Sequence, residues 1–568
     1  MSSSDGEHDA SVWDLSSSDD DVEPDTSGHV AESADEGSLQ SGEAAAKRAR
    51  RSKLGAKALK RHPSHRFPGQ FPPGPTSAAE LHEWPARFCM SLSQLGLWPN
   101  VLVKLAEGGV LCSDYTGSGC MDQAALMLRL YVNAGRESEG QEPLPCFRTY
   151  RACDSDLRCQ TLLRQHMDVQ EHASHVFKDI HDRVEIDVME QLQAICSESK
   201  KKVGQAEAAL NLAANCTSGK NSCKQHIKAL AGIQCEELIR VLRSHGENCM
   251  KSTSWCTSHD MECPLNDMGT KFTVWSGGNR CLDWTTFGAR RNWAGDDTLP
   301  FIIWCFSILR AGPDVVIQEC TPQFDLTYFR QILEDCYTIQ HRVICPSQLG
   351  FPVSRARQWA IAVRTSKWTL LEQFDGPSFE NMFYREIMLN ADVYFQTTAA
   401  GDAEVAQLIT RRAKRRGLTP HQSDGQPWPF RSIASPGLLA RLEGYRLLAE
   451  AEGNKCFVAN ISQNPDVMPL RGCILPTLLT RSCYALLRSD KVGLGLHDDP
   501  WIMTSDQALG AMGWPIAGLG ASPTIQNLLE PPLATMKPQF KYHVAGNGMH
   551  VAVAASVLVW VLAMTVDA

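Results

Sequence analysis

Long apolar runs are almost absent from this 568-residue sequence. The one long stretch, Val551 to Val566, has about 16 residues and includes Ser556, whereas a membrane-spanning helix needs about 20 mainly apolar residues. The first residues are polar and rich in Ser and Asp, unlike a secretory signal peptide. We therefore expect no membrane partner, and we expect the apolar stretch to form a buried C-terminal helix.

Two neighbouring segments near the start of the sequence each lack charges of one sign: the first lacks basic residues and the second lacks acidic ones. Residues 1–46 hold thirteen Asp or Glu, no Lys or Arg and few large apolar residues, which predicts an acidic disordered tail. Residues 47–62 hold eight Lys or Arg and no acid, typical of a nuclear localisation signal or a DNA-contacting arm, or of a solvated patch. A Pro/Gly linker completes the segment 47–77. The remaining chain has 47 basic and 51 acidic residues, so a nucleic-acid-binding face has to be local.

The dense disulfide pattern of small secreted domains is also missing. Twenty-one cysteines are spread over a long chain, so we expect mostly reduced thiols and an intracellular protein. Cys249, Cys256 and Cys263 are spaced seven apart, with His259 between the last two. Zinc sites usually have tighter cysteine pairs, so we favour ordinary thiols in an inserted helical subdomain, about 185–265, and predict no metal.

What the sequence does contain is an alternation of strand and helix patterns. A short apolar run, 110–112, leads through the glycine turn SDYTGSGC (113–120) into a stretch with helical spacing. Further buried-strand patterns lie at 315–320 and 359–364. Strand, glycine turn and helix form the opening unit of a doubly wound α/β domain, which is the fold class that we predict.

Glycine and acidic residues follow the first predicted strands. Gly117 and Gly119 allow a sharp turn and the close approach of a ligand to a helix N-terminus, although structural turns share this pattern. Asp154 follows the second strand, where an acid can bind ribose hydroxyls, and Asp179 follows the third. Three such strand ends fit a cofactor that lies across the carboxyl edge of the sheet.

Reactive side chains follow the later strands. Cys281 lies on a loop beside Arg280, and a nearby cation lowers a thiol pKa, so Cys281 is a candidate nucleophile, although most lone cysteines are only buried apolar residues. Glu319 ends an apolar strand, where a carboxylate is costly unless it binds something. Alternation places Arg355 and Arg357 on one face just before another strand, where they can hold a ligand.

The order of these motifs resembles that of the DNA cytosine-5 methyltransferases. In chain order they are SDYTGSGC, CDSD, KDI, GGNRCLDWT, GPDVVIQEC, PVSRARQWAIAV, LPTLLTRS and AGNGMHVAVA, covering about 109–566. Each motif is loose, but eight in the family's order are specific. The resemblance implies a Rossmann-like S-adenosylmethionine-dependent methyltransferase domain at 78–369, a smaller target-recognition region at 370–469 and a return to the catalytic domain at 470–568.

The resemblance also implies roles for individual residues. Cys281 would attack carbon 6 of a flipped-out cytosine, Glu319 would contact ring nitrogen 3 and the exocyclic amine, and Arg355 would hold the carbonyl oxygen, with Arg357 beside it. The cofactor would be S-adenosylmethionine, the partner cytosine-containing duplex DNA and the location the nucleus. The implied cofactor contacts are Tyr115, Gly117, Gly119, Asp154, Asp179 and Asn547.

A basic cluster lies in the region that corresponds to target recognition. Contact with DNA phosphates is one interpretation of it, and a solvated helix face is the other. The cluster consists of Arg411, Arg412, Lys414, Arg415 and Arg416.

The cysteine loop departs most from the family pattern. The family's G-G-P-P-C-Q, followed by a Ser, is GGNRCL here, with Arg280 before the cysteine, Leu282 after it and Thr285 in place of the Ser. A catalytically impaired, chromatin-associated protein with the same fold is therefore one alternative. An RNA cytosine-5 methyltransferase is another, but the target region lacks that branch's Cys-Phe-Thr signature.

Overall fold

The computed structural model describes most of the chain after residue 68. The predicted acidic tail and basic run lie outside the described residues. The described ranges are 69–166, 171–172, 174–212, 217–269, 271–285, 290–419, 421–422, 428–451, 456–465, 474–488, 500–521, 525–529 and 535–568.

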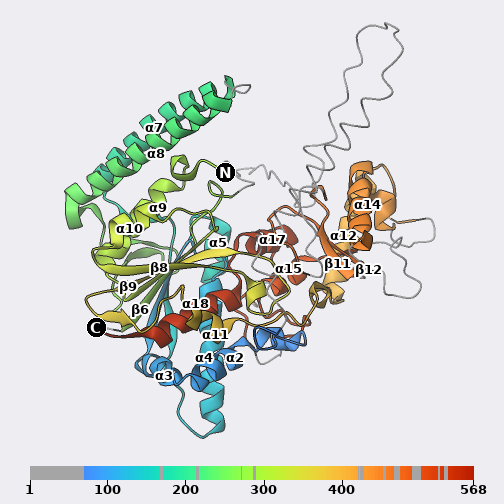
Figure 1. The fold of residues 1–568 in the computed structure, drawn as a ribbon, viewed down its shortest axis with the longest axis horizontal. Helices are drawn as coiled ribbons and strands as arrows, with labels where there is room; N and C mark the ends of the chain where they lie inside the picture. The colour runs from blue at the N-terminus through green and yellow to red at the C-terminus, as the bar shows by residue number, and fades with distance from the viewer. Residues whose placement is uncertain are drawn as a thin grey trace.

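A nine-stranded sheet in the order β5-β4-β3-β2-β1-β6-β7-β9-β8 lies at the centre (Figure 1). Its parallel strands are β1 (Gly109–Asp114), β2 (Phe147–Cys153), β3 (His175–Phe177), β6 (Phe272–Gly277) and β7 (Val315–Cys320). At one edge, β9 (Arg357–Arg364) runs antiparallel to β7, and β8 (Tyr337–Ile344) runs antiparallel to β9. The strand order reverses between β1 and β6, and doubly wound sheets bind ligands at such a point. The predicted fold class is confirmed.

Helices cover both faces of the sheet, which explains why β1, β6 and β7 are buried at every position. Val315 and Ile317 of β7 belong to one hydrophobic core, whereas Val316 belongs to the other. The first core contains α2 (Trp84–Gln94), α3 (Trp98–Glu107), α4 (Cys120–Ser138) and α18 (Val551–Met564). The second contains α9 (Thr298–Ala311) and α10 (Thr327–Leu333), and the short α5 (Leu157–Arg164) follows β2.

The predicted C-terminal helix is confirmed as a buried core element. All residues of α18 are buried, and α18 packs against α3 and α4. Together with α17 (Pro538–Asn547) it forms a segment long and apolar enough to cross a membrane, but 83% of its most apolar window is buried within the protein. The burial of this window accounts for its apolar composition.

The insertion after β3 is a long helical arm followed by a β-hairpin. Helices α7 (Ile186–Leu212) and α8 (Thr217–His245) pack along each other and project away from the sheet (Figure 1). Strands β4 (Thr253–Cys256) and β5 (Met261–Pro264) then extend the sheet beyond β3. The prediction of helix throughout 185–265 is therefore wrong for its last part, because residues 253–264 find unpaired backbone groups at the edge of the sheet.

A smaller lobe holds an antiparallel three-stranded sheet (Figure 1). Its strands are β11 (Cys456–Asn460), β12 (Tyr484–Arg488) and β13 (Trp501–Ile502), so this sheet spans the predicted boundary between 469 and 470. The lobe's helices are α12 (Ala399–Arg415), α13 (Phe430–Ile433), α14 (Pro436–Ala451) and α15 (Ser505–Ala511). Beside the main sheet lie α11 (Pro377–Phe383) and the pair β10 (Trp368–Leu370) and β14 (Thr565–Asp567).

A buried carboxylate at the end of β1 joins four segments. Asp114 accepts hydrogen bonds from Arg183 Nη1 at 2.9 Å, Arg151 Nη2 at 3.3 Å and Trp275 Nε1 at 2.5 Å. These partners lie on the turn after β3, on β2 and on β6. Burial alone would raise the pKa of Asp114, but the charges of Arg183 and Arg151 outweigh burial and lower it. The carboxyl ends of the central strands are thus held together by an ionised group.

We predict that Asp114→Asn destabilises the protein by about 3–5 kcal/mol, because two buried arginines lose their counter-charge. Urea denaturation measures this loss. Asp296→Asn is the matched control, since Asp296 is 75% exposed and pairs with Lys200 on the surface, where an ion pair contributes little. Equal, small losses for the two variants would show that the Asp114 contacts do not hold the strand ends.

Candidate active site

The turn after β1 is shaped by three residues with left-handed backbone conformations. The φ angles of Tyr115, Gly117 and Gly119 are 51°, 58° and 79°. A Cβ atom on Gly119, the N-cap of α4, would lie 2.7 Å from His166 Cε1, whereas one on Gly117 would meet no atom within 4 Å. The turn therefore needs glycine for its conformation and leaves open space beside Gly117.

The two predicted acids lie at the ends of β2 and β3. Asp154 accepts a hydrogen bond from Gly117 N at 2.8 Å, which ties the glycine turn to β2, and burial raises the pKa of Asp154. Asp179 accepts from His181 N at 3.0 Å and lies 2.8 Å from His181 Nδ1, and its hydrogen bond with His181 lowers the pKa of Asp179. The Asp179 side chain is 39% exposed. Both acids therefore border the same carboxyl edge as the glycine turn.

The C-terminal motif lies against the start of α4. Asn547 is exposed, and its amide lies 3.1 Å from His543 Nε2. Cys120 Sγ donates to Met549 O at 3.2 Å, and a Cβ atom on Gly548 would lie 3.4 Å from the same sulfur. Residues more than 400 positions apart thus form one wall of the candidate cofactor site.

The cysteine loop follows β6 and is fixed to β7 through a residue that sequence reasoning missed. Asn279 is buried, and it accepts from Gln318 Nε2 at 2.6 Å and donates to Cys320 Sγ at 3.6 Å. Asn279 stands where the family pattern has the first proline of its loop. The only signal in the sequence was this Asn in place of a proline. The side-chain hydrogen bonds of Asn279 hold the loop against β7.

Glu319 and the two arginines lie beside this loop. Glu319 Oε1 is 3.0 Å from Arg357 Nε, and both side chains are largely buried. Arg355 donates instead to Gly546 O at 2.9 Å and Leu478 O at 3.3 Å, and burial lowers its pKa to about 9. Arg357 is therefore the residue that faces Glu319. Arg355 connects the arginine segment (PVSRARQWAIAV) to the motifs LPTLLTRS and AGNGMHVAVA.

Cys281 is a half-buried thiol among these charges. Burial raises its pKa, Arg357 and Arg355 oppose that rise, and Glu319 adds to it. Burial also raises the pKa of Glu319 against the same two arginines. Arg280, which was expected to lower the thiol pKa, is 62% exposed and lies 3.6 Å from Asp297. The cations that act on the thiol come from the arginine segment instead.

The glycine between β6 and the cysteine connects the two halves of the site. A Cβ atom on Gly278 would lie 2.6 Å from Met549 Cε, 3.6 Å from Glu319 Oε2 and 3.9 Å from Tyr115 O. The predicted cofactor residues and the predicted reacting residues therefore meet at Gly278. A side chain at this position would displace the end of Met549.

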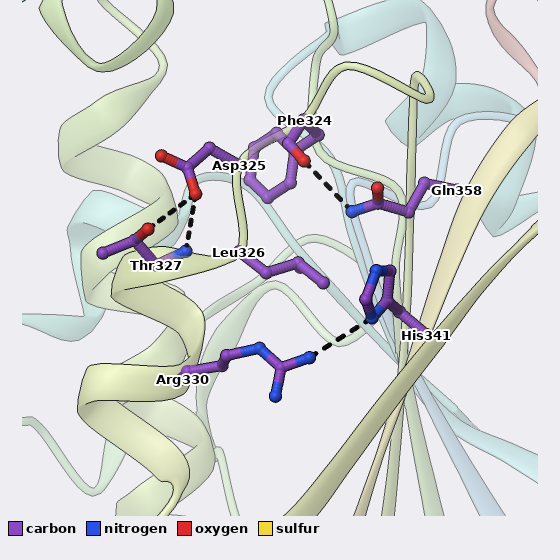
Figure 2. Close-up of a pocket in the computed structure, with 7 residues that line it drawn as sticks. All are labelled: Phe324, Asp325, Leu326, Thr327, Arg330, His341 and Gln358. Carbon is purple, nitrogen blue, oxygen red and sulfur yellow. Dashed lines mark hydrogen bonds between the residues drawn. The ribbon is translucent and has the colours of Figure 1, made fainter. Parts of the chain in front are cut away.

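A separate open hollow of about 300 Å³ lies after β7. Figure 2 shows its lining, in which Asp325 accepts from Thr327, Gln358 donates to Phe324 O and Arg330 faces His341. Side chains alternate along β9, so Gln358 and the neighbouring Arg357 point to opposite faces of the sheet. The lining of this hollow includes none of Cys281, Glu319 and Arg357.

The basic cluster lies at the C-terminal end of α12 and the residue after it. Arg412 packs inward with its guanidinium 5.1 Å from the ring centre of Phe430, and burial lowers its pKa. The side chains of Arg411, Lys414, Arg415 and Arg416 are exposed. Only four of the five predicted phosphate contacts thus lie on an accessible face.

Comparisons with known proteins give similar solved structures but no sequence match. No protein-family model and no curated protein matches the chain. An Entamoeba histolytica methyltransferase, EhMeth, is 10% identical with a TM-score of 0.38, covering 80% of this chain and 97% of that one. The S. pombe Dnmt2 methyltransferase is 10% identical with a TM-score of 0.36, covering 79% and 96%.

A putative DNA modification methyltransferase encoded within an E. coli prophage is also similar, at 10% identity and a TM-score of 0.32, covering 80% of this chain and 98% of that one.

We predict that Arg357→Met raises the pKa of the Cys281 thiol by about one unit or more, because the thiolate loses a neighbouring positive charge. The pH dependence of Cys281 alkylation, followed on its peptide by mass spectrometry, measures the shift. Arg280→Met is the matched control and should leave the profile unchanged. Equal shifts in the two variants would contradict the assignment of the charges.

Proposed function

We propose that the protein is a divergent S-adenosylmethionine-dependent DNA cytosine-5 methyltransferase that acts in the nucleus. The observation that carries this proposal is the buried Glu319, which lies 3.0 Å from Arg357. Both side chains are among the charges that act on the pKa of the Cys281 thiol. A carboxyl group, a guanidinium and a thiol suit the ring nitrogen, carbonyl oxygen and carbon 6 of cytosine. Glu319 approaches the glycine turn near Gly278, since a Cβ atom there would lie 3.6 Å from Glu319 Oε2 and 3.9 Å from Tyr115 O.

The residues at the carboxyl edge fit S-adenosylmethionine. The left-handed turn at Tyr115, Gly117 and Gly119 leaves open space beside Gly117, and Asp154 and Asp179 offer carboxylate oxygens at the next two strand ends. Carboxylates in this position suit ribose and adenine donors. The exposed Asn547 would border the same pocket. S-adenosylmethionine supplies an activated methyl group when it is bound.

The side chains of the cysteine loop and its neighbours would carry out the addition. The thiolate of Cys281 forms a bond to carbon 6, and the ring electrons move toward carbon 5, which becomes nucleophilic. Arg357 and Arg355 favour the thiolate. Burial raises the pKa of Glu319 and so favours its protonated form, which would donate to ring nitrogen 3 and stabilise the adduct.

Completion of the reaction restores the ring and the enzyme. After carbon 5 takes the methyl group, its proton leaves to a base, the bond between sulfur and carbon 6 breaks, and the electron pair returns to the thiolate. The cytosine has to leave the base stack for these steps, because the atoms of a stacked base are out of reach. Arg355, fixed by the carbonyls of Leu478 and Gly546, has its Nε free of partners among the described residues and can donate to the base.

Two features favour DNA over RNA as the substrate. The basic run at 47–62 is typical of nuclear proteins, and the target region lacks the Cys-Phe-Thr signature of the tRNA-methylating branch. The exposed basic residues at the end of α12 would contact phosphates, with an affinity that falls as salt concentration rises.

We predict that Cys281→Ser abolishes methyl transfer to duplex DNA and leaves S-adenosylmethionine binding largely intact, because the nucleophile is lost and the glycine turn is not. Transfer of a tritiated methyl group and calorimetric titration of the cofactor measure the two properties. Cys336→Ser, which changes an exposed thiol, is the control and should keep full activity.

The same assay on tRNA and on duplex DNA tests the substrate. Transfer to DNA alone supports the proposal, and transfer to tRNA alone identifies an RNA methyltransferase. Cofactor binding without transfer to either would identify a catalytically silent protein.

A further inference from the structure

Four side chains with metal-binding atoms converge at the edge of the main sheet. His175 lies on β3, Cys256 ends β4, His259 lies in the hairpin turn, and Cys263 lies on β5. Their ligand atoms are all within 4.8 Å of one another. The two cysteines are buried, and the two histidines are half-buried.

Three of the distances between these atoms are close to the edges of a tetrahedral zinc site. His259 Nδ1 lies 3.1 Å from His175 Nδ1, 3.5 Å from Cys256 Sγ and 3.4 Å from Cys263 Sγ. Zinc binds His nitrogen at about 2.0–2.1 Å and Cys sulfur at about 2.3 Å, so ligand atoms of a tetrahedral site lie roughly 3.3–3.8 Å apart.

Hydrogen bonding alone accounts poorly for this arrangement. His259 Nδ1 carries either one hydrogen or one lone pair, yet three groups are directed at it within 3.5 Å. A cation at the centre of the four atoms would satisfy all of them at once. The surroundings also fix one ligand, since the ring of His175 packs edge-on against Tyr150 at 5.1 Å and stacks on Phe177 at 5.8 Å.

The cluster lies where strand β3 is short and pairs with β4 at few positions. Strand β3 has only three residues, and its pairing with β4 consists of Phe177 opposite Cys256, with Thr257 N donating to Val176 O at 2.7 Å. His175 and His259 are 84 residues apart, and the arm of α7 and α8 lies between them. A metal ion here would close the base of the arm and hold the strand that leads to Asp179.

We propose that His175, Cys256, His259 and Cys263 bind one structural zinc ion. The site is closed by four protein ligands, which is typical of structural rather than catalytic zinc. Cys249 is not part of the site, although its sequence spacing groups it with Cys256 and Cys263, because its sulfur donates to Gly246 O at 2.9 Å. The proposal does not depend on the proposed methyltransferase activity.

Elemental analysis of the purified full-length protein tests the proposal. We expect one zinc ion per chain in the wild type and in Cys249→Ser, and its loss in the double variant Cys256→Ser/Cys263→Ser. Removal of zinc with a chelator should lower the Tm of the wild type by several degrees, and Cys249→Ser should show the same shift. The double variant should show no response to the chelator.

A measurement on the wild type alone covers the case in which the double variant fails to fold. Cobalt added to the metal-free protein should give the absorption spectrum of tetrahedral cobalt bound to thiolate. Wild-type protein without zinc that takes up neither metal would overturn the proposal. A double variant with unchanged zinc content, or a disulfide between Cys256 and Cys263 in the freshly purified protein, would also overturn it.

Discussion

The burial of one ionised carboxylate under the carboxyl edge of the sheet is the constraint on which the candidate site depends. Asp114 is bound by Arg183, Arg151 and Trp275, which come from three other segments. A buried charge is costly unless it is fully paired, so none of these segments can move without the others. The glycine turn starts at the next residue, Tyr115, and its position is therefore fixed by the same contacts.

The cysteine loop keeps its reacting atoms while its supports differ from the family pattern. Asn279 hydrogen-bonds with Gln318 and Cys320 and so holds the loop against β7. Arg280 turns to Asp297, so the charges that favour a thiolate at Cys281 come from the arginine segment. Arg357 and Arg355 therefore oppose the rise that burial and Glu319 cause in the pKa of Cys281.

Local patterns in the sequence were sufficient to predict the doubly wound sheet, the glycine turn and the buried C-terminal helix, because each depends on apolar periodicity or on glycine. Contacts between residues far apart in the sequence could not be predicted from such local patterns. Sequence alone did not show that Arg357 rather than Arg355 faces Glu319, nor that β12 pairs with β11 across the predicted boundary at 469. His175 was missed as a partner of His259 because 84 residues separate them.

Trapping a covalent adduct between Cys281 and cytosine would identify the nucleophile. In duplex DNA that carries 5-fluorocytosine, carbon 5 holds a fluorine that cannot leave as a proton does, so the adduct persists after methyl transfer. With S-adenosylmethionine present, we expect mass spectrometry to find the modified base on the peptide that contains Cys281. A protein that binds the cofactor and the DNA but forms no adduct, or forms it at another residue, would show that Cys281 is not the nucleophile.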